Sequence, residues 1–169
     1  MIDIIMLSTL LAGPQHGYAL KKSASLILNQ PELHNNTVYP LLERFIGQGW
    51  VRKKNDAGER GQTRHVYSLT PAGRSEVIAR LSEFNEKQAS SDAEFRLRVG
   101  LFGLLTSQAR RRILEARALA LERRDQHLSS LQQSFPLTGF NAEAVRFSRE
   151  QITNELRWIR KLSRMHPRA

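Results

Sequence analysis

The side chains best suited to recognise a partner lie at the start of an apolar helical pattern over residues 35–48. Asn35, Asn36, Thr37 and Tyr39 all carry hydrogen-bonding groups there. An asparagine amide can bond the edge of an adenine, and a threonine offers a methyl to thymine or a hydroxyl to either base. The free N–H groups at a helix N-terminus also suit a phosphate. This chemistry favours a helix that reads DNA, although the first three side chains could also serve only as helix caps.

Pro40 makes the exact start of this helix important. If the helix begins at Thr37, the proline lies in the first turn, where its missing N–H is not needed. If the helix begins at Asn35, the proline should kink it after the first turn.

A run of cations follows the helix. Residues 44–64 hold six basic residues against two acidic ones. A short extended segment at 50–54 and an alternating segment at 64–69 flank turn-forming residues, which predicts a two-stranded β-hairpin. A basic hairpin loop can rest on phosphates or enter the minor groove, whereas a charge run by itself is more often a solvated face. The candidate DNA contacts in this region are Arg44, Lys53, Lys54, Arg60 and Arg64.

These candidates need helices and a hairpin to position them. The apolar periodicity predicts helices at residues 2–12, 16–29, 35–48 and 70–87, with the hairpin before the last of them. Three helices followed by a hairpin is the order of a winged helix-turn-helix, whose third helix enters the major groove of DNA. We therefore expect a mainly α fold with an N-terminal winged helix-turn-helix domain over residues 1–88.

The second half, residues 89–169, is predicted to be an all-α dimerisation and effector domain. A hinge is expected at residues 89–92, and two long helices should follow, capped by Thr106 or Ser107 and by Asn141. Apolar residues recur every seven positions along both helices, so the helices should pack against each other and against a partner subunit. The candidate dimer contacts are Leu114, Leu121, Leu128, Val145, Ile152 and Ile159.

The formal net charge of +10 and the pI near 10.8 predict association with a polyanion. Residues 1–88 hold 11 Lys and Arg against 8 Asp and Glu, and residues 89–169 hold 15 against 8, so the second half is the more basic. An RNA-binding protein is therefore an alternative, but the sequence lacks the aromatic-rich sheet or glycine loops that usually clamp single-stranded RNA. A helical module that binds only protein is another alternative, and the basic hairpin argues against it.

Nothing in the sequence indicates catalysis. The motifs of serine hydrolases, P-loop enzymes, dinucleotide-binding enzymes and zinc proteases are all missing. Cysteine is absent and the five histidines are scattered, so we expect no metal, no cofactor and no enzyme activity. The apolar N-terminus lacks the basic start of a signal peptide, and no apolar run approaches the roughly 18 residues of a membrane span. A cytoplasmic protein without a membrane contact is therefore expected.

Four short motifs occur in a characteristic order. They are H-G-Y at residues 16–18, N-T-V-Y-P-L-L-E-R at 36–44, G-W-V at 49–51 and R-H-V-Y-S-L-T-P-A-G at 64–73. Together they closely resemble the PadR family of bacterial transcriptional regulators. The helical second half looks like the longer C-terminal domain of one branch of that family.

The resemblance implies a homodimeric repressor or regulator that binds double-stranded DNA at a near-palindromic operator. It also implies that the C-terminal helices embrace the partner subunit. Carried onto this sequence, the resemblance implies base contacts by Asn36, Thr37 and Tyr39, with Asn35 beside them. It implies contacts near the DNA backbone by His16, Tyr18 and Lys21. The wing contacts would be Lys53, Lys54, Arg60 and Arg64. The role of His65 stays open. Tyr67 is expected in the core, because the strand alternation points it inward with Leu69.

The same resemblance implies a small-molecule effector, because members of this branch respond to phenolic acids and others bind flat cationic drugs. An aromatic carboxylate would need an arginine or histidine beside an apolar wall. The candidates, chosen on this chemistry alone, are Arg96, Arg98, His127, Arg157 and Trp158. Trp158 could instead be ordinary packing beside Ile159.

Overall fold

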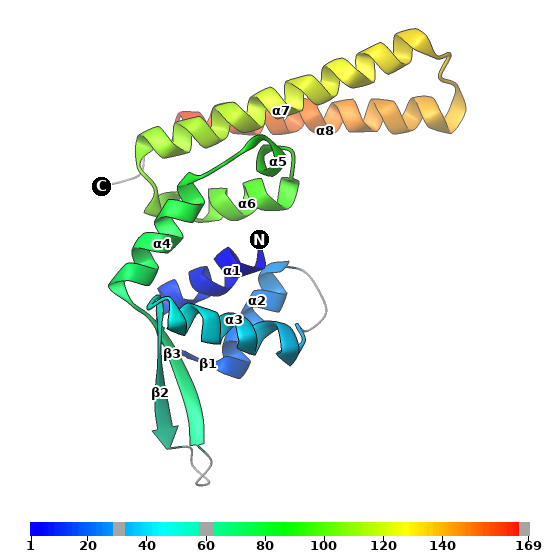
Figure 1. Ribbon diagram of the computed structural model, residues 1–169. Helices are drawn as coiled ribbons and strands as arrows, with labels where there is room; N and C mark the ends of the chain where they lie inside the picture. The colour runs from blue at the N-terminus through cyan, green and yellow to red at the C-terminus, as the bar shows by residue number, and fades with distance from the viewer. Residues whose placement is uncertain (29–32, 58–62, 166–169) are drawn as a thin grey trace. The chain divides into compact units, whose positions relative to one another are not determined.

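The computed structural model describes residues 1–28, 33–57 and 63–165 (Figure 1). These residues form two compact units, Met1–Leu81 and Ser82–Ala169. The division into folding domains at residues 88 and 89 stays a prediction.

The N-terminal unit is a winged helix, which confirms the predicted fold class. Among the described residues of this unit, three helices precede the two strands of a hairpin, one helix follows them, and a short third strand lies between the first two helices (Figure 1). The helices are α1 (Ile2–Thr9, extended by the 3-10 turn Leu10–Ala12), α2 (Gly17–Leu28), α3 (Asn35–Gly47) and α4 (Pro71–Ser82). The strands are β1 (Gln15–His16), β2 (Val51–Ala57) and β3 (Thr63–Leu69), in the order β1-β3-β2.

The apolar face of α3 anchors this unit. Val38, Leu42 and Phe45 lie at helical spacing and are completely buried, together with Leu20 of α2 and Leu7 of α1. Complete burial of an aliphatic or aromatic side chain stabilises a fold by about 1.5–3 kcal/mol relative to exposure. The opposite side of α3 is left exposed, so its polar residues are available for contacts.

The hairpin is confirmed, and the structure adds a strand. Lys53 lies opposite Tyr67 in the β2–β3 register. The two-residue strand β1 pairs with β3 on its other side, with Gln15 opposite Tyr67 and His16 opposite Val66. A segment of two residues is too short to show a period of two, so the sequence could not reveal β1.

The fourth helix is shorter than predicted. It ends at Ser82 rather than at residue 87, and a separate helix α5 (Glu86–Ala89) begins after Asn85. The side chain of Asn85 accepts a hydrogen bond from the Gln88 N–H at 3.0 Å, and Gln88 Oε1 accepts one from the Asn85 N–H at 2.9 Å. The sequence carries this reciprocal capping box as N-x-x-Q, a local signal that starts a new helix where apolar periodicity alone predicts a continuous one.

Every secondary-structure element in the described part of the C-terminal unit is a helix. After α5 come α6 (Asp92–Gly100), the 3-10 turn Phe102–Leu104 and the long helices α7 (Ser107–Ser134) and α8 (Gly139–Ser163) (Figure 1). Thr106 caps α7, as predicted, by accepting a hydrogen bond from the Ala109 N–H. The cap predicted at Asn141 is wrong, because α8 already begins at Gly139 and Asn141 lies inside its first turn. The predicted hinge at residues 89–92 coincides with the short connection from α5 to α6, where Ser91 caps α6.

The heptad-spaced apolar residues of α7 and α8 pack mainly within one chain. Five of the six residues predicted as dimer contacts are buried in the isolated subunit. They are Leu114, Leu121, Val145, Ile152 and Ile159, whereas Leu128 is half-buried. The prediction that α7 and α8 pack against each other is therefore supported, but five residues of the row are not free for a partner.

No helix in the described part of the chain combines the length and apolarity that crossing a membrane requires. The same residues contain no group of three or more acidic or histidine side chains placed to hold a metal ion.

Candidate nucleic-acid interface

The N-terminal turn of α3 presents its polar side chains to solvent. The helix begins at Asn35, and Asn35, Asn36 and Thr37 are all exposed. The N-cap residue is His34, and it makes no side-chain capping bond. The interpretation of the three side chains as caps is therefore wrong, because they lie inside the first turn.

Pro40 falls in the second turn of α3, which nevertheless continues as one helix to Gly47. A proline has no N–H, so the carbonyl of Asn36 loses its helical hydrogen-bond donor. Asn36, Thr37 and Tyr39 on this turn are all exposed.

Helix α2 supports the same turn. The Lys21 ammonium donates a hydrogen bond to Asn35 Oδ1 at 3.1 Å and lies 5.9 Å from the ring centre of Tyr18. Tyr18 itself is 65 % exposed. The side chains predicted near the DNA backbone therefore adjoin those predicted to read bases.

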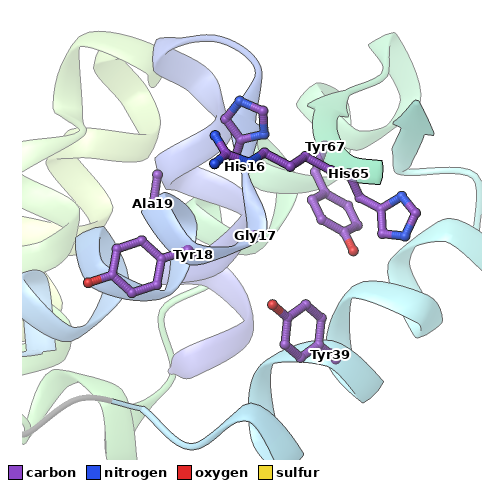
Figure 2. Close-up of a pocket in the computed structure, with 8 residues that line it drawn as sticks. His16, Gly17, Tyr18, Ala19, Tyr39, His65 and Tyr67 are labelled. Carbon is purple, nitrogen blue, oxygen red and sulfur yellow. The ribbon is translucent and has the colours of Figure 1, made fainter. Parts of the chain in front are cut away.

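A hollow of about 510 Å³ joins the start of α2, α3 and the hairpin. Its lining side chains include His16, Tyr18, Tyr39, Arg64, His65 and Tyr67. In Figure 2 the labelled side chains come from β1 and the start of α2, from α3 and from β3, and Tyr39 and Tyr67 both point toward the space below Gly17. The hollow thus gathers residues from three of the four sequence motifs.

The hairpin carries both paired and unpaired cations. Lys53 donates a hydrogen bond to Glu43 Oε1 at 2.9 Å, and this bond raises the pKa of Lys53 despite a small opposing effect of burial. Lys54 and Arg64 are exposed and form no ion pair with a described residue. Their charges are therefore available to a phosphate. Arg60 lies outside the described residues.

The histidines of this region contact the hairpin. His65 Nδ1 is 3.0 Å from Asn55 Oδ1, which suggests a structural role for the residue left open by sequence. His16 Nε2 lies 3.8 Å from Asp56 Oδ2. His16 therefore links β1 to the far part of β2.

Arg44 is placed differently from the other candidates. It lies near the C-terminal end of α3, pairs with Asp3 of α1 and stacks 5.7 Å from the ring centre of Phe45. These contacts fasten α1 to α3. Its side chain is still 52 % exposed, so a DNA contact stays a prediction for Arg44.

The five effector candidates do not form one pocket. Arg98 is 1 % exposed, bonds Glu94 and the Glu83 carbonyl, and is therefore a structural residue. Trp158 packs edge-on against Phe95, with ring centres 5.8 Å apart. The remaining candidates are the exposed residues Arg96, His127 and Arg157. Arg157 lines a hollow of about 720 Å³ on α7 and α8 that none of the other four touches.

The comparisons with known proteins agree with the motifs. Residues 6–79 match the model of the Transcriptional regulator PadR-like family. No curated protein matches the chain.

Several solved structures are similar to this chain. A Thermoplasma acidophilum protein described as a transcriptional regulator is 32 % identical, with 46 % of this chain and 74 % of that chain covered and a TM-score of 0.43. A PadR family transcriptional regulator of Eggerthella lenta is 33 % identical, with 44 % of this chain and 63 % of that chain covered and a TM-score of 0.40. Bacillus subtilis PadR in complex with operator DNA is 18 % identical, with 95 % of this chain and 96 % of that chain covered and a TM-score of 0.47.

The matched residues run from within α1 to within α4 and include all three strands of the sheet. The resemblance inferred from the four motifs is thereby confirmed. Through its residues 6–79, the chain belongs to the transcriptional regulator PadR-like family.

Proposed function

We propose that this protein is a cytoplasmic, sequence-specific repressor that binds double-stranded DNA as a homodimer. The observation that carries the proposal is the exposed start of α3, where Asn36, Thr37 and Tyr39 face solvent and Tyr39 lines one hollow together with the unpaired cation Arg64 of the hairpin. Hydrogen-bonding side chains at the start of a helix suit base edges, and the neighbouring cations suit phosphates. Membership of a family of transcriptional regulators supports the same function.

A dimer would place two copies of α3 in successive major grooves, with centres about 34 Å apart, so the operator should be nearly palindromic. The predicted seam residues are largely buried within one chain, so other side chains must supply the dimer contact. Exposed apolar residues of the C-terminal unit are the alternative candidates, namely Leu119, Phe135, Phe140 and Phe147.

An effector that releases the repressor belongs to the same proposal. Arg157 is the predicted effector residue that lines a hollow, and an aromatic acid could place its carboxylate there. The unit also supplies Arg146 and Arg149 to this hollow, but both are engaged with acidic partners.

The proposal is tested by measuring binding to duplex DNA from upstream of the protein's own gene and to a shuffled duplex, across a salt series. A large preference for the first duplex that survives at about 200 mM salt is the expected result, since counterion release weakens purely electrostatic binding steeply. Equal affinity for both duplexes calls for the neighbouring promoters to be tried next. If these are also bound no better than the shuffled duplex, specific DNA readout is excluded, and tighter binding of single-stranded RNA would then favour the RNA-binding alternative.

Tyr39→Ala is expected to lower the discrimination between operator and shuffled duplex by roughly 1–3 kcal/mol, the usual contribution of a base contact. Tyr39 is 41 % exposed at the mouth of the hollow, so its removal should leave the fold intact. The measurement is the ratio of dissociation constants for the two duplexes. An unchanged ratio would show that Tyr39 does not read bases.

Lys54→Ala is expected to weaken binding to both duplexes equally and to reduce the salt slope by about one unit, as the loss of one phosphate contact should. Lys87→Ala is the matched control, because Lys87 is an exposed lysine in the C-terminal unit. A loss confined to the operator would contradict the backbone role of Lys54.

A further inference from the structure

Tyr67 combines nearly complete burial with an unpartnered hydroxyl group. Its side chain is 1 % exposed, as expected for a core residue, yet its hydroxyl makes no hydrogen bond to any described residue. It nonetheless lines the hollow, and Figure 2 shows its oxygen directed toward the side where Tyr39 lies. The hydroxyl is therefore the polar end of a buried ring that has no partner within the described residues and is open to the hollow, where a ligand can replace water as its hydrogen-bond partner.

His16 lines the hollow as well, and its side chain is 44 % exposed. The Nδ1 atom of His16 is buried and has no hydrogen-bond partner among the described residues. Because this atom is inaccessible, the Tyr67 hydroxyl is the lining group that can bond a ligand in the hollow.

The electrostatics of the hollow favour an anion. Arg64 brings a cation that has no acidic partner among the described residues, and the first residues of the 12-residue helix α2 lie in the lining. The N–H groups of a first helical turn have no intrahelical partner and attract negative charge. Burial raises the pKa of Tyr67, although the charge of Lys53 opposes the shift, so the hydroxyl keeps its proton and can donate.

Glycine at position 17 lets the walls come together. A Cβ atom on Gly17 would lie 3.2 Å from Tyr39 Cε1 and 3.3 Å from Tyr67 Cε2. With glycine there, the two rings form apolar walls around a space that ends in hydrogen-bonding groups. Apolar walls suit a sugar ring, and the polar groups and the cation suit the phosphate attached to it.

We propose that this hollow holds one sugar–phosphate unit of the DNA backbone, with the Tyr67 hydroxyl donating to a phosphate oxygen and Arg64 supplying the opposing charge. This inference rests on the proposed function, since the duplex provides the backbone unit. It assigns a binding role to Tyr67, a residue that sequence alternation places only in the core.

The test is Tyr67→Phe, which removes the hydroxyl and keeps the ring. The variant should bind the upstream and the shuffled duplex about tenfold more weakly than the wild type, as the loss of a hydrogen bond to a charged group predicts. Its unfolding midpoint in urea should not fall. Arg64→Met should weaken both duplexes as well, from an exposed position that the core does not need.

A scan with neutral methylphosphonate links identifies the phosphate. In each half-site, one methylphosphonate link should weaken the binding of the wild type. The same link should cause no further loss of affinity in Tyr67→Phe, and none in Arg64→Met. An undiminished affinity of Tyr67→Phe for the shuffled duplex would overturn the inference. A loss of affinity confined to the upstream duplex would also overturn it. The same holds if the loss caused by Tyr67→Phe adds in full to the loss caused by every methylphosphonate link in the scan.

The two hypotheses fail in different ways. If the wild type binds the upstream, neighbouring-promoter and shuffled duplexes equally, the proposed sequence-specific function fails. The Tyr67→Phe comparison on the shuffled duplex still decides whether the hollow binds backbone.

Discussion

Arg117→Met should lower the free energy of unfolding of the C-terminal unit by about 3 kcal/mol, the cost of removing one partner of a buried ion pair. Arg117 is 2 % exposed, although it carries a full charge. Methionine keeps most of the apolar stem, so the loss should come from the missing guanidinium rather than from a cavity.

The guanidinium joins four segments of the unit. It bonds both carboxylate oxygens of Glu155 on α8, at 2.7 and 2.9 Å, and the carbonyl of Ala89 at the end of α5, at 2.8 Å. It also pairs with Asp92 on α6 and lies 5.4 Å from the ring centre of Phe95. Burial acts to lower the pKa of Arg117, but the hydrogen bonds to Glu155 and Asp92 outweigh this effect and leave the pKa above its ordinary value.

Unfolding of this unit can be followed separately, because the two tryptophans lie in different units. In a Trp50→Phe background, the fluorescence of Trp158 reports the C-terminal unit during urea unfolding. Arg123→Met is the matched control, because Arg123 pairs with Glu86 while both side chains are more than half exposed. Such surface pairs contribute about 0–1 kcal/mol. Equal effects of the two substitutions would show that the burial of Arg117 contributes nothing.

A double variant separates the lost attraction from the carboxylate left behind. Glu155→Leu added to Arg117→Met should recover roughly 1 kcal/mol, because no half-buried Glu155 carboxylate is then left without its cation. A double variant less stable than Arg117→Met would contradict this account.

The second large effect is expected from Gly73→Ala, which should destabilise the N-terminal unit by about 3 kcal/mol. A Cβ atom at this position would lie 2.1 Å from the carbonyl oxygen of Trp50. That oxygen accepts a hydrogen bond from the Thr70 N–H at 2.9 Å and lies 3.1 Å from the Thr70 hydroxyl, whose single proton is shared with the nearer Gly49 carbonyl at 2.7 Å. Moving it would weaken the N–H bond, which contributes about 1 kcal/mol, and add the strain of overpacking, about 1–3 kcal/mol.

Gly47→Ala provides the control, since a Cβ on this helical glycine would meet nothing within 4 Å. It should be neutral or slightly stabilising, because alanine favours a helix over glycine. A Trp158→Phe background lets Trp50 report the unit in urea unfolding. Gly73→Ala with the stability of the wild type would mean that the first turn of α4 can shift away from Trp50 without loss.

The motif L-T-P-A-G therefore has a physical explanation. Thr70 caps α4 by accepting a hydrogen bond from the Gly73 N–H at 3.0 Å, and its hydroxyl bonds the Gly49 carbonyl at 2.7 Å. Pro71 opens the helix where no N–H is needed. The motif thus attaches the start of α4 by hydrogen bonds to the segment between α3 and β2, and so fixes the base of the hairpin.

The sequence by itself determined the elements whose signals are local. The period of Val38, Leu42 and Phe45 predicted α3, turn residues between two extended segments predicted the hairpin, and Thr106 predicted the start of α7. Local signals suffice here because helical spacing, turn chemistry and caps each act within a few residues. The order of these elements and their motifs also sufficed to indicate the family.

Only the tertiary structure decided which side chains are still available once the chain has folded. Leu121 and Ile152 had the spacing of a dimer seam, but they are buried within one subunit. Arg98 was predicted as an effector contact and is a buried structural residue, and Arg117 is equally buried although nothing in its local sequence indicates this. Tyr67 was predicted in the core and lies there, yet its unpartnered hydroxyl faces the hollow. The reason is physical: burial and pairing depend on groups far apart in the sequence, and a one-dimensional pattern shows which face of an element is apolar but not what covers it.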